Sequence, residues 1–284
     1  MLVISNGAMK SGSTWLSAIL LRLVDHKPLP AKFHDERFGA VPTIKWERLG
    51  EFLDTVDYAN DTYVTKNHFY YERDLLARYK NIYLIDIDRN LADTLVSMFF
   101  HVKKKYSSWG TEDRRLDDIV DAYWRFGPDM TEDLVRYHAV WRTAGPWAHV
   151  SSYERLKTDP APQITAIAKF LGVPLPAEKL QRIIEETEFG SLSKTMLSAS
   201  EGIFARFRKG EIGDHRNYFD EEILEDIRRI EADNINYPAT AEEKADFARK
   251  CAEWGGRGHP FPREPNSYQQ SPPRMRSDRN KATA

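Results

Sequence analysis

A loop of small residues connects a strand pattern to a helical pattern at the start of the chain. Residues 2–5 form a short, mostly apolar stretch typical of a buried strand, and residues 14–24 place apolar side chains at helical spacing. Such a loop points backbone N–H groups and a helix N-terminus at an anion. The start of the chain therefore predicts an α/β unit that binds a phosphate-like group. The loop and the first helical residues are Gly7, Ala8, Met9, Lys10, Ser11, Gly12, Ser13, Thr14 and Trp15.

Three further stretches with strand character follow, each separated from the next by enough chain for a helix. They cover residues 63–65, 82–87 and 149–152. This spacing predicts a parallel sheet with crossover helices. The helical patterns cover residues 91–102, 116–126, 131–142 and 164–171.

Glycine, proline and aspartate residues indicate where some of these helices begin and end. Gly127 and Pro128 are expected to separate the second helical pattern from the third. Asp220 precedes a further helical pattern, in which the apolar side chains lie on one face. The chain has 284 residues, of which 41% are hydrophobic, and this fits one large domain. We therefore predict an α/β three-layer sandwich with a central parallel sheet, formed by residues 1–254.

The composition limits the compartment and the partners. Cys251 is the single cysteine, which suits a reducing compartment, so we expect a cytoplasmic protein. The net charge of −2 gives no reason to expect nucleic acid or an anionic membrane as a partner. No signal peptide or membrane span is expected. From about residue 255 onward, glycine, proline, serine and arginine replace the apolar periodicity, so residues 255–284 are expected to be disordered or loosely docked.

The small-residue loop differs from the loop of ATP-binding proteins. Those proteins place lysine directly after the second glycine of G-x-x-x-x-G-K-[ST], whereas Lys10 precedes Gly12 here. This displacement argues against a kinase or an ATPase. The sequence instead resembles the Lys-Ser-Gly-Thr-Thr-Trp loop of the cytosolic sulfotransferases, which cradles the 5′-phosphosulfate of 3′-phosphoadenosine 5′-phosphosulfate (PAPS). The resemblance implies a P-loop NTPase-like fold and PAPS binding by Lys10, Ser11, Gly12, Ser13, Thr14 and Trp15.

Two segments are similar to the family's ligands for the 3′-phosphate. Arg89 and Ser97 have the family's separation, although Leu91 replaces the usual proline. Residues 207–219 resemble the family's Arg-Lys-Gly-x-x-Gly-Asp-Trp-Lys-Asn stretch, with His215 where tryptophan is common. A phosphomonoester requires charge-assisted donors, which two adjacent cations beside a glycine can provide. The resemblance implies binding of the 3′-phosphate by Arg208, Lys209 and Gly210 together with the arginine and the serine.

Weaker matches suggest an adenosine site. Tyr153 stands where the family has a tyrosine that reaches the adenosine, and Thr187 and Phe189 resemble the family's Thr-Ser-Phe. An adenine ring between Trp15 and Phe189 would gain stacking energy of about 1–3 kcal/mol.

The stretch Lys66-Asn67-His68 resembles the family's Lys-Thr-His, in which the histidine deprotonates the acceptor. Histidine suits a general base because its ordinary pKa lies near neutrality. The resemblance implies that Lys66 neutralises the sulfuryl oxygens and that Lys10 stabilises the leaving oxygen. Glu72 is an alternative base. No metal is expected, because no cluster has metal-ligand spacing.

We therefore expect transfer of a sulfuryl group from PAPS to a hydroxyl or amine of a small-molecule acceptor. Residues 33–51, 103–128 and 194–206 are expected to line the acceptor pocket, with Phe33, Phe38 and Trp46 providing apolar surface.

Two other functions remain open at this point. One is a P-loop phosphotransferase with Asp86 or Asp88 as a magnesium ligand. The other is a non-catalytic nucleotide-binding module, against which the presence of both Lys66 and His68 argues. The family's dimerisation stretch is not recognisable in residues 219–226, so the oligomeric state is not predicted.

Overall fold

The computed structural model of the protein describes residues 1–108, 117–188 and 209–254. Its centre is a parallel sheet of four strands in the order β2-β1-β3-β4. All four strands lie where the sequence predicts them, and each is one residue longer than expected. The strands are β1 (Leu2–Asn6), β2 (Tyr63–Lys66), β3 (Ile82–Asp88) and β4 (Ala148–Ser152).

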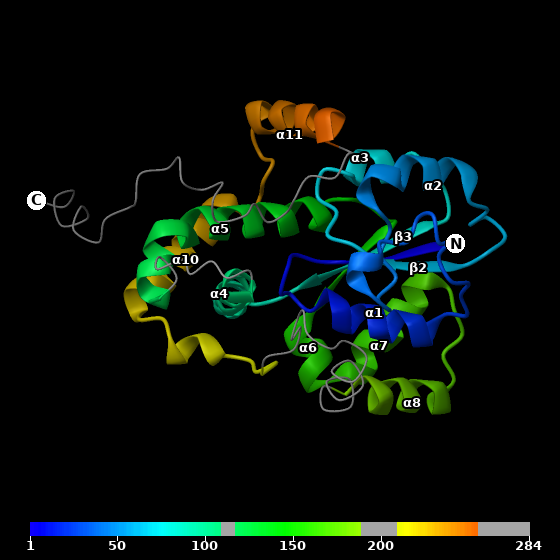
Figure 1. Cartoon of the computed structure of the whole chain (residues 1–284), viewed down its shortest axis with the longest axis horizontal. Coiled ribbons are helices and arrows are strands. Elements are labelled where there is room, and N and C mark those ends of the chain that lie inside the picture. Colours follow the sequence, from blue (N-terminus) through cyan, green and yellow to red (C-terminus); the bar gives the residue numbers. More distant parts are fainter. Residues whose placement is uncertain (109–116, 189–208, 255–284) are drawn as a thin grey trace, which may run out of the picture.

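Side chains along each strand are buried alternately on the two faces of the sheet. Leu2, Ile4 and Leu84 belong to one apolar core, whereas Val3 and Ile85 belong to a second core on the opposite face. This alternation follows from the two-residue period of a strand. Helices cover both faces (Figure 1), so the predicted three-layer α/β architecture is confirmed.

One face is covered by α1, α7 and α8, and the other by a larger group of helices (Figure 1). The first group and the short helix α6 have these bounds: α1 (Ser13–Leu23), α6 (Tyr153–Thr158), α7 (Pro160–Leu171) and α8 (Ala177–Thr187). The second group comprises α2 (Leu49–Thr55), α3 (Arg73–Leu76), α4 (Leu91–Ser108) and α5 (Ile119–Arg142). Two further helices pack outside it: α10 (Glu221–Asn234) against α5, and α11 (Ala241–Trp254) against α3. Short 3₁₀ turns lie at Glu36–Phe38, Trp46–Arg48 and Asp214–Asn217.

Helix α5 corrects one prediction. Gly127 and Pro128 do not separate two helices, because α5 continues through both residues. Its two halves bury one continuous apolar face against the core, and this packing outweighs the backbone hydrogen bond that proline cannot donate. Glycine is required at 127, since a Cβ atom there would lie 2.2 Å from Cδ2 of Tyr123.

The strand order determines where a ligand can lie. The neighbours of β1 are β2 on one side and β3 on the other, so the connections after β1 and β2 lead to opposite sides of β1. In open parallel sheets the crevice outside the carboxyl ends at such a switch point is the usual ligand site. Residues 7–12 follow β1 at this position. No helix in the described part of the chain is long and apolar enough to cross a bilayer, and residues 255–284 lie outside the described residues.

Candidate active site

The loop between β1 and α1 turns tightly through two residues with left-handed backbone conformation. Lys10 and Gly12 adopt positive φ angles of 71° and 110°. The backbone N–H of Ser11 donates to Ala8 O at 3.1 Å, and the Ser11 hydroxyl donates to the same oxygen at 2.7 Å. The Ser11 hydroxyl therefore closes the loop internally. Ser13 begins α1 and Thr14 follows it, so the loop ends at the positive end of a helix dipole.

Tyr153 brings four of the predicted segments together. Its ring centroid lies 5.4 Å from that of Trp15 in an edge-to-face contact, and the Arg89 guanidinium lies 4.4 Å above its ring. Its hydroxyl donates to Gly210 O at 3.1 Å. A Cβ atom at Gly12 would lie 2.7 Å from Cδ2 of this tyrosine, so the close approach of loop and ring requires glycine.

Arg89 connects the loop of residues 7–12, called the phosphate loop below, to the glycine-rich segment that begins at Lys209. Its Nη1 donates to Lys10 O at 3.1 Å and its Nη2 donates to Glu211 O at 3.2 Å. Only 9% of the residue is exposed. Its Nε is buried and has no hydrogen-bond partner among the described residues. Lys209 Nζ lies 3.0 Å from Asp214 Oδ1, at the far end of the same segment.

The remaining predicted nucleotide ligands lie on two helices or outside the described residues. Thr187, the last residue of α8, accepts a hydrogen bond from Trp15 Nε1 through its carbonyl oxygen at 2.8 Å. Ser97 lies half-buried in α4, two turns after the arginine. Phe189 and Arg208 lie outside the described residues.

His68 lies directly beside the phosphate loop. Its Nδ1 is 2.5 Å from Gly7 O, and its Nε2 is 2.6 Å from Lys66 Nζ. A carbonyl oxygen can only accept, so Nδ1 carries the proton and Nε2 of the neutral ring is the acceptor. The ring therefore presents its basic nitrogen on the side of the lysine.

The environment keeps this histidine neutral. Burial lowers the pKa of His68 well below its ordinary value, and the nearby cations Lys66 and Lys10 and the imidazole of His101 lower it further. The sequence analysis did not identify His101 as a site residue. Its position in α4, three turns after Arg89, was the available indication.

Core side chains hold the His68 loop. Asn6 Oδ1 accepts from the backbone N–H of Phe69 at 2.8 Å, and Trp141 Nε1 donates to the carbonyl oxygen of Phe69 at 2.9 Å. The backbone N–H of Gly7 donates to the Tyr137 hydroxyl at 3.1 Å. Sequence analysis missed these residues, because two of the three partners lie on α5, far along the chain.

Comparisons with known proteins show the family to which the chain belongs. A family model described as "Sulfotransferase domain" matches residues 3–237. The chain belongs to the sulfotransferase family. The family predicted from the sequence is thus confirmed, and this protein is a sulfotransferase by family.

Named relatives and solved structures agree with this assignment. The chain is 27% identical over 250 residues to flavonol 3-sulfotransferase of Flaveria bidentis, covering 78% of this chain and 77% of that one. It is 28% identical over 256 residues to cytosolic sulfotransferase 7 of Arabidopsis thaliana, covering 78% and 74%.

Mouse sulfotransferase SULT7A1, solved in complex with PAP, has a TM-score of 0.62 at 18% identity and covers 91% of this chain and 88% of its own. Retinol dehydratase in complex with androsterone and inactive cofactor PAP has a TM-score of 0.60 at 18% identity, covering 84% and 82%. PAP is adenosine 3′,5′-bisphosphate. These structural similarities support the α/β fold described above for this sulfotransferase.

The alternative residues considered from the sequence have structural partners. Glu72 is 4% exposed and accepts from the backbone N–H of Tyr70 at 2.8 Å, and burial raises its pKa to about 7. Asp86 accepts from Asn6 Nδ2 at 3.1 Å and lies 3.0 Å from His138 Nδ1. Within the described residues no group of three or more potential metal ligands gathers.

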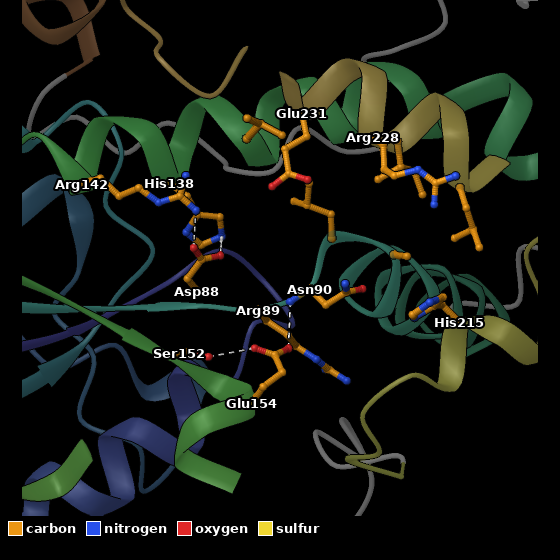
Figure 2. A pocket seen from close by; sticks show the side chains of 15 residues that line it. Asp88, Arg89, Asn90, His138, Arg142, Ser152, Glu154, His215, Arg228 and Glu231 are labelled. Carbon is orange, nitrogen blue, oxygen red and sulfur yellow. Dashed lines mark hydrogen bonds and ion pairs between the residues drawn. The ribbon is translucent and has the colours of Figure 1, made fainter. Parts of the chain in front are cut away.

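A pocket of about 400 Å³ lies beside the β3–α4 turn (Figure 2). Figure 2 shows His138 above Asp88, and Glu154 below Asn90 with a hydrogen bond to its backbone N–H of 2.9 Å. Arg142 forms an ion pair with Asp88 at one side. The pocket shares Arg89 with the predicted nucleotide site but contains none of residues 7–15 in its lining.

The aromatic residues predicted for the acceptor pocket divide into two groups. Phe33 is fully buried and packs edge-to-face on Phe52, with ring centroids 5.2 Å apart, so it is a core residue and its predicted role in the pocket is wrong. Trp46 packs partly buried against the same core. Phe38 is different, because Lys66 Nζ lies 5.4 Å from its ring centroid. Residues 109–116 and 194–206 lie outside the described residues.

Proposed function

We propose that this sulfotransferase transfers the sulfuryl group of PAPS to a hydroxyl or amine of a small-molecule acceptor, with His68 as the general base. The observation that carries the proposal is the separation of 2.6 Å between His68 Nε2 and Lys66 Nζ, next to Gly7 of the phosphate loop. The proposed base and a cation thus lie within hydrogen-bond distance of each other, next to the proposed anion site. A nucleotide-binding module without catalysis would not need this pair.

Several features support PAPS as the donor. The buried Nε of Arg89 lacks a partner among the described residues, and an anionic oxygen would satisfy it. Trp15 and Arg89 both contact the ring of Tyr153, as a shared nucleotide site requires. The two solved neighbours are described as complexes with PAP.

The residues fit an in-line displacement. PAPS supplies the sulfuryl group, with PAP as the leaving group. Lys66 Nζ turns from His68 Nε2 to the sulfuryl oxygens, which frees the lone pair of Nε2. This nitrogen then accepts the proton of the acceptor hydroxyl or amine as the new bond to sulfur forms. Lys66 stabilises negative charge on the sulfuryl oxygens, and Lys10 stabilises the bridge oxygen from which sulfur departs. Positioning and electrostatic stabilisation supply most of the rate in such transfers.

Relatives and the loop that contains Phe38 support a small acceptor. The Flaveria relative is named as a flavonol sulfotransferase, and the retinol dehydratase structure contains androsterone. Phe38 beside Lys66 would give a flat or apolar acceptor a contact near the base. We also propose a cytoplasmic location, which the name of the Arabidopsis relative supports.

Two measurements test the proposal. Calorimetry without magnesium should show tight binding of adenosine 3′,5′-bisphosphate and much weaker binding of AMP. Incubation with labelled PAPS and a panel of phenols, alcohols, amines and oligosaccharides should label a small molecule. Equal binding of AMP would contradict the donor assignment, and transfer confined to the oligosaccharides would contradict the acceptor class.

A further inference from the structure

Asp93 in the first turn of α4 is a buried carboxylate that receives hydrogen bonds from a distant loop. Its side chain is 1% exposed. Its Oδ2 accepts from the backbone N–H of Gly213 at 2.7 Å. Its Oδ1 accepts from the backbone N–H of His215 at 3.0 Å and lies 2.8 Å from Nδ1 of the same residue. These three contacts join residues that are more than a hundred positions apart in the sequence.

The loop that Asp93 holds carries the predicted ligands of the 3′-phosphate. Gly210 at the start of the loop accepts from the Tyr153 hydroxyl at 3.1 Å, and Lys157 Nζ also bonds its carbonyl oxygen. Arg89 holds Glu211. The first half of the loop therefore contacts the nucleotide side of the site, and Asp93 holds the second half.

Asp93 itself is unsuited to contact a phosphate, because two negative groups at close range repel each other. Its charge is instead compensated by the N–H donors of the loop. Hydrogen bonds to an ionised acceptor are stronger than neutral ones, so this carboxylate determines the position of the loop. Without it, the N–H groups of Gly213 and His215 would lose their acceptor.

Helix α4 links these contacts to the phosphate ligands. Arg89 precedes the helix by two residues. Ser97 follows Asp93 by four residues, which places Asp93 and Ser97 on the same helical face. The loop is therefore held in register with the arginine and the serine by one rigid element.

We propose that Asp93 is the positioning residue that sets the preference of this protein for a 3′-phosphorylated nucleotide. It acts by fixing residues 209–217 relative to Arg89. This inference rests on the proposed function, because it presumes that the site receives PAPS.

The test compares Asp93→Asn with Asp226→Asn. Asp226 is an equally buried carboxylate at 1% exposure, but it lies on α10 and bonds Tyr123 and Arg229. Calorimetry gives the ratio of the dissociation constants of AMP and adenosine 3′,5′-bisphosphate. We expect Asp93→Asn to reduce this ratio at least about 10-fold by weakening the bisphosphate alone. Asp226→Asn should leave the ratio unchanged within about twofold. In turnover, Asp93→Asn should raise the KM for PAPS without raising the KM for the acceptor.

A second pair keeps the test decisive if Asp93→Asn does not fold. His215→Asn retains an N–H donor near the position of Nδ1, whereas His215→Leu removes it. We expect the leucine variant to lose preference for the bisphosphate and the asparagine variant to retain it. An unchanged ratio in Asp93→Asn, or equal ratios in the His215 pair, overturns the role of Asp93. A wild-type protein that binds AMP as tightly as the bisphosphate overturns the proposed donor and this inference together.

Discussion

Lys66 Nζ and His68 Nε2 are 2.6 Å apart, so the ammonium group and the imidazole lie within hydrogen-bond distance at the end of β2. The lysine can donate to this nitrogen only while the histidine is neutral. Its charge in turn opposes protonation of the ring. The pair therefore holds the histidine in the neutral form that the proposed general base requires.

Replacement of His68 should remove turnover and spare nucleotide binding. We expect His68→Ala to lower kcat by about 10²–10⁴-fold, the range that a positioned base contributes. The dissociation constant of the bisphosphate should stay within about twofold, since the base acts on the acceptor. Glu72→Gln is the control, because it keeps an acceptor for the backbone N–H of Tyr70. An active His68→Ala protein with an inactive Glu72→Gln protein would reverse the two assignments.

The pH dependence should follow the lowered pKa of His68. The base works in its neutral form, so kcat/KM should stay level as the pH falls from 8 through the ordinary histidine pKa near 6.5 and should decline only below it. Lys66→Met removes a cation that lowers this pKa, so the decline should move to higher pH. A wild-type decline centred at the ordinary pKa, with no displacement in Lys66→Met, would show that another group limits the rate.

Substitution of Gly12 should damage both stability and binding. Gly12→Ala adds a Cβ 2.7 Å from Cδ2 of Tyr153 at a φ angle of 110°. We expect a loss of about 1–3 kcal/mol in the free energy of unfolding and weaker binding of the bisphosphate. Gly172→Ala is the control, because Gly172 has a φ of 67° with open space around it. It should cost about 1 kcal/mol of stability and leave binding unchanged. Equal effects of the two variants on binding would contradict the steric argument.

Phe38 should affect the acceptor and leave the donor alone. Its ring lies beside Lys66, so Phe38→Ala removes an apolar contact near the reacting group. We expect the KM for a phenolic acceptor to rise about 10-fold, as the loss of a buried aromatic contact predicts, with no change in the KM for PAPS. Steady-state kinetics with each substrate varied in turn would measure this. A change confined to the KM for PAPS would place Phe38 in the nucleotide site.

Sequence reasoning could place those parts of the candidate site that lie in short segments at or after strand ends. The loop from Gly7 to Gly12 follows β1 directly, Lys66 ends β2 and His68 lies two residues after it. Strand prediction therefore places these residues at the same edge of a parallel sheet. The contacts of Asp93 with Gly213 and His215 could not be predicted this way. They depend on how α4 packs against residues 209–217, and no local sequence pattern determines which residues meet there.

Helix prediction was wrong where tertiary packing outweighed a local preference. Gly127 and Pro128 are typical of a helix end, yet the apolar face of α5 continues across them. The consequence reaches the site, because Tyr137 and Trp141 on the second half of α5 hold Gly7 and Phe69. The role of α5 beside the base was therefore not foreseeable from residues near His68.

The way α5 and Asp93 hold the two sides of the site has a kinetic consequence. The side formed by the phosphate loop and the His68 loop is bonded to core residues of α5 and β1. The side formed by residues 209–217 is held by side-chain contacts from Arg89, Asp93, Tyr153 and Lys157. Separation of the two sides costs least where no core packing is broken. Entry of the nucleotide and departure of PAP should therefore occur on the 209–217 side, while the base and its lysine stay in place from one turnover to the next.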